Sequence, residues 1–219
     1  MRSDDDIKRD VENELRWDPE ITLNDIIGVA VRNGIVTLTG FVRGYDEKVA
    51  AEAAAKRVAG VVAVANDIEV RLPGEDAPPD PDIVRDAIAM IETAQPDIAG
   101  HIKVTASKGW VTLEGEVERN DQREVAERVA RYLKGVTGVT NLIQVRSKLP
   151  PTEDIKHQIE EAFRRNAELD ANRIAVEAKG GEVILTGTVR SWAERQEAER
   201  VAWMAPGVVK VENRIAVSP

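Results

Sequence analysis

The polar residues with the most regular spacing are three asparagines, Asn66, Asn141 and Asn213, which recur at offsets of 75 and 72 residues among apolar neighbours. An amide in such a place can help to bind an ion or a ligand. It can also satisfy nearby backbone groups where a strand is irregular. Because strands otherwise disfavour asparagine, we expect the second, structural role.

Other residues that could do chemistry lack partners of the right type. His101 and His157, the two histidines of the chain, are not accompanied by a paired base, a nucleophile or a metal-binding set. Glu114, Glu116 and Glu118 alternate along one strand, which is typical of a solvated face. The chain has no cysteine and no phosphate-binding loop or nucleophile elbow. We therefore expect no enzyme and no cofactor, and the sequence assigns no metal ligands.

The tryptophans are more informative. Each of Trp17, Trp110, Trp192 and Trp203 stands where another repeat of the chain has a polar residue. Large aromatic side chains at such positions are candidates for an interaction surface. We expect them to pack between repeats; an external partner or membrane surface, and the core of their own repeat, are the alternatives.

These residues lie on a repeated framework. The template Gly-x-Val-x-Leu-x-Gly-x-Val occurs as GIVTLTGFV at 34–42, GWVTLEGEV at 109–117 and GEVILTGTV at 181–189. Its glycines have structural roles at turns and on buried strand faces, and we expect no phosphate cradle among them. They are Gly34, Gly40, Gly109, Gly115, Gly181 and Gly187. Asn33-Gly34, Lys108-Gly109 and Gly180-Gly181 suit tight hairpin turns that need a positive φ.

Hydrophobic periodicity places further elements around each hairpin. A helix with an apolar residue at every fourth position precedes it, and Ser3, Asp80 and Thr152 are the expected N-caps. A second helix with an alanine-rich stripe follows, and a third strand ends the unit. Gly40, Gly115 and Gly187 share strand parity with buried valines, so we expect the alanine stripe to approach the sheet closely there.

The unit is therefore helix, strand, strand, helix, strand. A right-handed crossover through the second helix adds the third strand to the sheet of the hairpin. The predicted fold is α+β, with three tandem αββαβ modules, each a small three-stranded mixed sheet packed against two helices. We place the modules at 1–72, 81–148 and 149–219, with a proline-rich acidic linker at 73–80. The shorter second joint predicts that copies two and three lie closer together, with copy one loosely tethered.

The template, the alanine-bearing helix and a repeated ending together resemble the BON-domain family. That ending is GVVAVANDI at 60–68, GVTGVTNLI at 135–143 and GVVKVENRI at 207–215. The resemblance covers nearly the whole chain. It implies a binding module, because the family includes an osmotically inducible periplasmic protein, outer-membrane lipoproteins that engage phospholipid, and a cytoplasmic potassium-responsive protein.

Composition limits the partners. The chain has 219 residues, 42% of them hydrophobic, and a net charge of −9, which opposes attraction to nucleic acid and to anionic lipid. No apolar run is long enough to span a membrane, and the start MRSDDDIKRDV is too acidic for a secretory signal. We therefore expect a cytoplasmic protein, with a periplasmic location less expected.

Three functions follow as hypotheses. The first is a non-enzymatic protein of osmotic or envelope stress that docks to phospholipid headgroups or to an envelope-facing protein partner. The second is a cytoplasmic sensor that binds potassium through backbone carbonyls, which leave no side-chain signature. The third is a structural scaffold that presents three similar faces.

Overall fold

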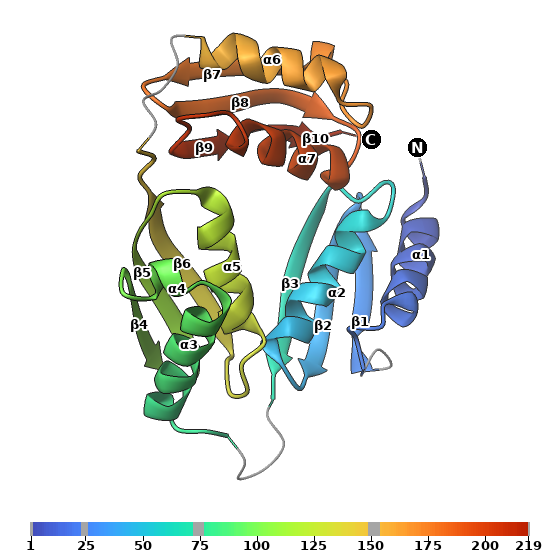
Figure 1. Cartoon of the computed structure of the whole chain (residues 1–219). Coiled ribbons are helices and arrows are strands. Elements are labelled where there is room, and N and C mark those ends of the chain that lie inside the picture. Colours follow the sequence, from blue (N-terminus) through green and yellow to red (C-terminus); the bar gives the residue numbers. More distant parts are fainter. Residues whose placement is uncertain (1, 23–25, 72–76, 149–153, 219) are drawn as a thin grey trace.

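The computed structural model describes residues 2–22, 26–71, 77–148 and 154–218, and it contains three successive α+β modules (Figure 1). Module 1 consists of α1 (Asp4–Trp17), β1 (Gly28–Arg32), β2 (Ile35–Val42), α2 (Tyr45–Arg57) and β3 (Ala63–Val70). Module 2 consists of α3 (Asp80–Ala94), α4 (Pro96–Ala99), β4 (Ile102–Ser107), β5 (Trp110–Val117), α5 (Asn120–Arg131) and β6 (Gly138–Val145). Module 3 consists of α6 (Ile155–Arg165), a 3₁₀ turn (Ala171–Arg173), β7 (Ile174–Lys179), β8 (Glu182–Val189), α7 (Trp192–Trp203), β9 (Lys210–Asn213) and β10 (Ala216–Val217).

Each module has a mixed sheet, as predicted, and the second hairpin strand lies in the middle of it. The two hairpin strands are antiparallel, and the strand after the second helix joins the middle strand in parallel. The predicted fold of three mixed-sheet modules is therefore confirmed. In module 3 the last strand is interrupted between Asn213 and Ala216, where the guanidinium of Arg195 donates to the carbonyl oxygens of Asn213 and Ile215.

The hairpin turns have the expected left-handed backbone, with φ of 52° at Asn33 and 74° at Gly34 in module 1. An aspartate at the start of the preceding helix accepts hydrogen bonds from both turn amides. Asp4 does so at 2.8 and 3.0 Å in module 1, and Asp80 does so at 2.8 Å twice in module 2.

Two of the three predicted N-caps lie in the described chain. Ser3 caps α1 as expected, through a 3.1 Å bond from the amide of Asp6. The prediction for Asp80 is wrong, because Pro79 holds the cap position and the Asp80 carboxylate serves the hairpin instead. Thr152 lies outside the described residues.

The motif glycines at the end of the middle strand also have a role that differs from the prediction. A Cβ on any of them would lie 2.1 Å from a backbone oxygen of the residue that leads into the first strand, and their φ values run from 116° to 146°. The entering backbone, and not the alanine-rich helix, therefore requires these glycines. They are Gly40 against Ile26, Gly115 against His101 and Gly187 against Arg173.

The three second helices, α2, α5 and α7, lie around the middle of the molecule (Figure 1). Helices α2 and α7 are in contact, so module 1 packs against module 3 despite the distance between them in sequence. The expectation of a loosely tethered copy one is therefore wrong, because linker length does not decide which surfaces meet.

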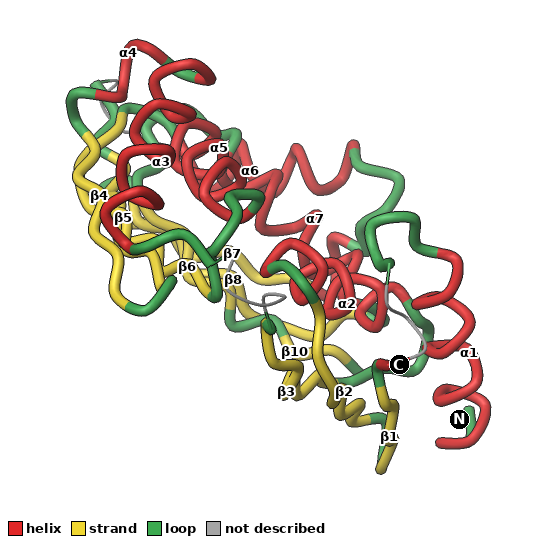
Figure 2. Tube along the Cα trace, turned by 90° about the horizontal axis from the view of Figure 1, so that it is seen from below, coloured by secondary structure: helices red, strands yellow, loops and turns green. Residues whose placement is uncertain are grey.

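All three sheets lie on the same side of the molecule. Seen from below, the strands line one side and the helices the other (Figure 2), and in the first view the helices stand in front of the strands (Figure 1). Within each module the helices cover one sheet face, which carries the buried side chains. The open face of every sheet therefore points to the side away from the helices.

Candidate functional site

The repeated asparagines connect the last strand to the second helix. In module 2 the Asn141 amide donates to the carbonyl oxygen of Arg123 at 3.0 Å and to the Glu127 carboxylate at 3.1 Å, and its oxygen accepts from the Ile143 amide at 3.1 Å. Asn66 and Asn213 make the same three bonds in their own modules. The amide is thus fully used within the fold, in keeping with a structural role.

One of these networks contains a shifted carboxyl group. Burial alone would raise the pKa of Glu52 in module 1, but the ammonium group of Lys56 and the amide of Asn66 hold that pKa below its usual value. Glu52 is therefore ionised at neutral pH and joins α2 to β3.

The described residues do not bring a catalytic set together. Glu116 lies on the exposed face of β5 and pairs with Arg146, and Glu118 directly follows β5 and pairs with Lys148. Within the described ranges, no three His, Asp or Glu side chains are grouped closely enough to hold a metal ion. The buried carboxylate of Glu47 accepts the amide of Arg43 at 3.1 Å and also binds Thr22, so it fixes the start of α2.

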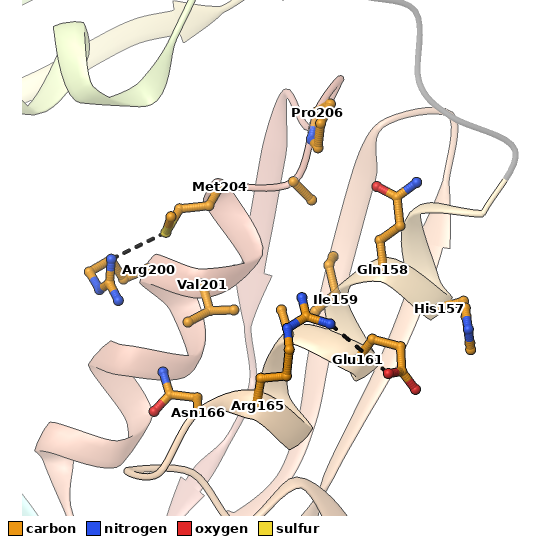
Figure 3. Close-up of a pocket in the computed structure, with 12 residues that line it drawn as sticks. His157, Gln158, Ile159, Glu161, Arg165, Asn166, Arg200, Val201, Met204 and Pro206 are labelled. Carbon is orange, nitrogen blue, oxygen red and sulfur yellow. Dashed lines mark hydrogen bonds and ion pairs between the residues drawn. The ribbon is translucent and has the colours of Figure 1, made fainter.

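A cavity of about 670 Å³ lies between α6 and α7 in module 3 (Figure 3). Ile159, Val201 and Met204 contribute apolar walls, and His157 lies at its edge. Glu161 pairs with Arg165 beside it. No base and nucleophile face one another among the residues that line this cavity.

The open sheet faces differ in charge over the two rows of residues nearest the hairpin turn. In module 2 one row across the sheet consists of Thr105, Thr112 and Thr140, and the next consists of Ser107, Trp110 and Gly138. The matching rows of module 1 contain Ala30, Thr37 and Ala65, then Arg32, Ile35 and Ala63. In module 3 they contain Glu177, Ile184 and Glu212, then Lys179, Glu182 and Lys210. In these two rows modules 1 and 2 carry a single charged residue, Arg32, whereas module 3 carries five. The next row of module 2 contains the charged residues Lys103 and Glu114.

Trp110 is the main apolar feature of the module 2 platform. Its ring lies flat on the sheet over Gly138, where a Cβ would come within 2.4 Å of the ring atoms. Its indole N–H donates to the Thr140 hydroxyl at 2.8 Å. The side chain remains 50% exposed, and Ile35 at the equivalent place in module 1 is 47% exposed. The ring is therefore held in one orientation while half of its surface stays open to a partner.

Two of the other tryptophans lie between modules. Trp192, at the start of α7, packs against the core of module 1, and the ammonium group of Lys56 lies 4.9 Å from the centre of its ring. Trp203, at the end of α7, packs against the cores of modules 2 and 3. Trp17 ends α1 with 84% of its side chain exposed. The four residues singled out from the sequence therefore do not form one site.

Tyr45 is an intermodule residue that the sequence did not single out. It begins α2 and packs against the core of module 2. Burial raises the pKa of its hydroxyl, although a backbone hydrogen bond with Val139 acts in the opposite direction. Tyr45 and Trp192 occupy the same place in their repeats, and that coincidence of two aromatic residues is the signal that could have identified it.

Comparison with known proteins agrees with the repeated fold. The family model described as BON domain matches residues 3–71, 80–147 and 151–219. Osmotically-inducible protein Y of Escherichia coli (strain K12) is 32% identical over 123 residues, which cover 51% of this chain and 59% of that protein. This chain thus spans less than two thirds of that relative's length.

Two solved structures from Chlamydia trachomatis are also similar in part. One is described as CdsD, a structural protein of the type III secretion system; it covers 98% of this chain and 93% of its own, at 15% identity and a TM-score of 0.26. The other is the C-terminal domain of CdsD, which covers 100% of both chains at 15% identity and a TM-score of 0.25.

Proposed function

Because this chain belongs to the BON-domain family, with three BON domains in tandem, we propose that it is a non-enzymatic, stress-associated binding protein that docks to phospholipid surfaces. The relationship to an osmotically inducible protein supports the association with stress. The single observation that carries the docking proposal is the common orientation of the three open sheet faces (Figure 2).

Three faces on one side suit an extended, flat ligand. Modules that bind the same surface together raise one another's effective concentration, so weak contacts add up to useful affinity. None of the helices in the described part of the chain has the length and apolarity to cross a membrane. The proposed docking is at the headgroup level.

Trp110 is the residue that we expect to enter the headgroup region. Tryptophan is favoured at membrane interfaces because its ring is apolar and still carries a polar edge. Ile35 supplies a smaller apolar contact on module 1. The net charge of −9 opposes anionic lipid, so the proposed surface is zwitterionic phospholipid.

Vesicle flotation tests the proposal with variants that the repeats themselves provide. The chain should float with phosphatidylcholine vesicles, and less well when phosphatidylglycerol is added. Trp110→Glu, which copies module 3, should abolish flotation, whereas Trp110→Ile, which copies module 1, should retain most of it. Trp17→Glu is the control for a lost surface tryptophan and should float normally.

Two results of the flotation experiment would contradict the docking proposal. If the chain does not float with either lipid, or if Trp110→Glu floats as well as the unaltered chain, the docking proposal is wrong. Thermal unfolding in potassium and in sodium completes the test, because a ligand that binds the native state raises its stability. Selective stabilisation by potassium without flotation would replace lipid docking with ion sensing.

A further inference from the structure

The three modules meet at junctions that use equivalent positions of their second helices. At two junctions the first residue of one second helix lies beside a residue at or near the end of another. Trp192 lies under Lys56 at 4.9 Å, and Asn120 lines one cavity with Trp203. At the remaining junction Tyr45 packs against the core of module 2. The residue pairs correspond through the offsets of 75 and 72.

The junction of modules 1 and 3 combines an aromatic ring with a cation, and the junction of modules 2 and 3 does not. The ammonium group of Lys56 lies over the Trp192 ring, 4.9 Å from its centre. At the junction of modules 2 and 3 the ring is Trp203 and the opposite residue is the neutral Asn120. In the part of the chain that is described, cations stack on Trp192 and Phe41, and none stacks on Trp203.

The third junction also contains a cavity of about 410 Å³. Trp203, Met204 and Pro206 line it from the end of α7, and Asn120 and Glu124 line it from the start of α5. This volume lies within the range of roughly 300–1,000 Å³ that is usual for small-molecule sites. One wall of the cavity is therefore aromatic and apolar, and the other is polar.

The charges around this cavity leave one carboxylate uncompensated. Arg119 is held by Asp121 at 2.8 and 2.9 Å, and Glu118 pairs with Lys148. The Arg200 guanidinium forms an ion pair with the Glu197 carboxylate, with 2.6 Å between nitrogen and oxygen.

Glu124 differs from these paired groups. It accepts a 2.7 Å bond from the neutral amide of Asn120 and has no cationic partner among the described residues. The site thus offers the accessible part of the Trp203 ring and the Glu124 carboxylate to one positive charge.

We infer that this cavity binds a small organic cation of the quaternary ammonium class. Methylated ammonium groups stack on tryptophan faces, and a nearby carboxylate balances their charge without needing an N–H donor. A hard metal ion would need several oxygen ligands, whereas the cavity presents one uncompensated carboxylate. The ligand would supply the cation that Lys56 supplies at the junction of modules 1 and 3.

Calorimetric titration of the full chain with choline and with tetramethylammonium tests this assignment. We expect saturable binding of both. The neutral carbon isostere 3,3-dimethyl-1-butanol should not bind, because it has the same shape and no charge. Glu124→Gln should weaken binding at least about five-fold, because it removes the balancing charge.

Trp203→Lys is the sharpest variant, because it copies the residue of module 1 and builds the missing cation into the chain. It should bind choline at least about ten-fold more weakly. Its circular dichroism and thermal midpoint should show that it remains folded. If it does not fold, Glu124→Gln and the neutral isostere carry the test.

The outcomes distinguish ligand binding in this cavity from docking through Trp110. They also distinguish a free organic cation from a lipid headgroup. Trp110→Glu should bind free choline normally even if it no longer floats. If the chain binds phosphatidylcholine vesicles but not free choline, and if Trp203→Lys abolishes this vesicle binding, the cation belongs to a lipid headgroup. Absence of binding in both forms, or equal binding of the neutral isostere, overturns the inference.

Discussion

The ammonium group of Lys56, near the end of α2, lies 4.9 Å from the centre of the Trp192 ring at the start of α7. Arg195 lies over the same ring at 5.1 Å. Arg195 belongs to the same helix as Trp192, so it is Lys56 that joins two modules separated by the whole of module 2 in sequence. This contact holds the first and third modules together.

Trp192→Ala should therefore loosen the contact between modules 1 and 3. Loss of a large packed ring and its cation contacts costs about 2–4 kcal/mol. Denaturant unfolding followed by circular dichroism should show a lower midpoint, and small-angle scattering should show a larger radius of gyration. Trp17→Ala is the matched control, since that side chain is 84% exposed and should change neither quantity. Equal behaviour of the two variants would exclude a structural role for Trp192.

Gly115→Ala should destabilise module 2 severely. The new Cβ would lie 2.1 Å from the His101 oxygen, at a φ of 146° that side chains rarely adopt. We expect a loss of about 3 kcal/mol or more in the free energy of unfolding. Gly100→Ala is the control, because no atom lies within 4 Å of its Cβ and its φ is −71°. A small effect of Gly115→Ala would show that the entering backbone can move aside.

Asn141→Leu should cost about 1–3 kcal/mol, because it leaves the Arg123 carbonyl and the Ile143 amide without their partner. Chemical denaturation measures this loss. Gln144→Leu, on an exposed position of the same strand, is the comparison and should be nearly neutral. If both variants lose the same stability, the network around Asn141 is not the cause.

Glu52 predicts a dependence of stability on pH. Its pKa is lowered in the folded protein from the ordinary value of 4.5, so the ionised form stabilises the fold. That contribution is fully present above pH 4.5 and is lost as the pH falls through the lowered pKa. Glu52→Gln should therefore be less stable than the unaltered chain near neutral pH. On acidification its free energy of unfolding should fall by less than that of the unaltered chain. Parallel pH profiles of the two proteins, measured by thermal unfolding, would contradict this role.

The sequence by itself determined the repeat and the fold of each module. Helical and strand periodicities, together with the turn glycines, depend on neighbours along the chain, so they can be read without knowledge of distant contacts. The type of turn at Asn33-Gly34 is an example, because its positive φ values follow from local sterics. The expectation of a structural role for Asn141 also came from its place in a strand.

Tertiary structure decided which surfaces of the modules meet. The contact between Lys56 and Trp192 joins residues that no local pattern connects, and linker length did not predict it. The same is true of the backbone approach that requires Gly115, because it brings the residue before β4 against β5. Packing between modules depends on the shapes of whole faces, and only the folded chain brings those faces together. For this reason the sequence identified four notable tryptophans, and the fold assigned Trp110 to an open face, Trp17 to an exposed helix end, and Trp192 and Trp203 to the junctions.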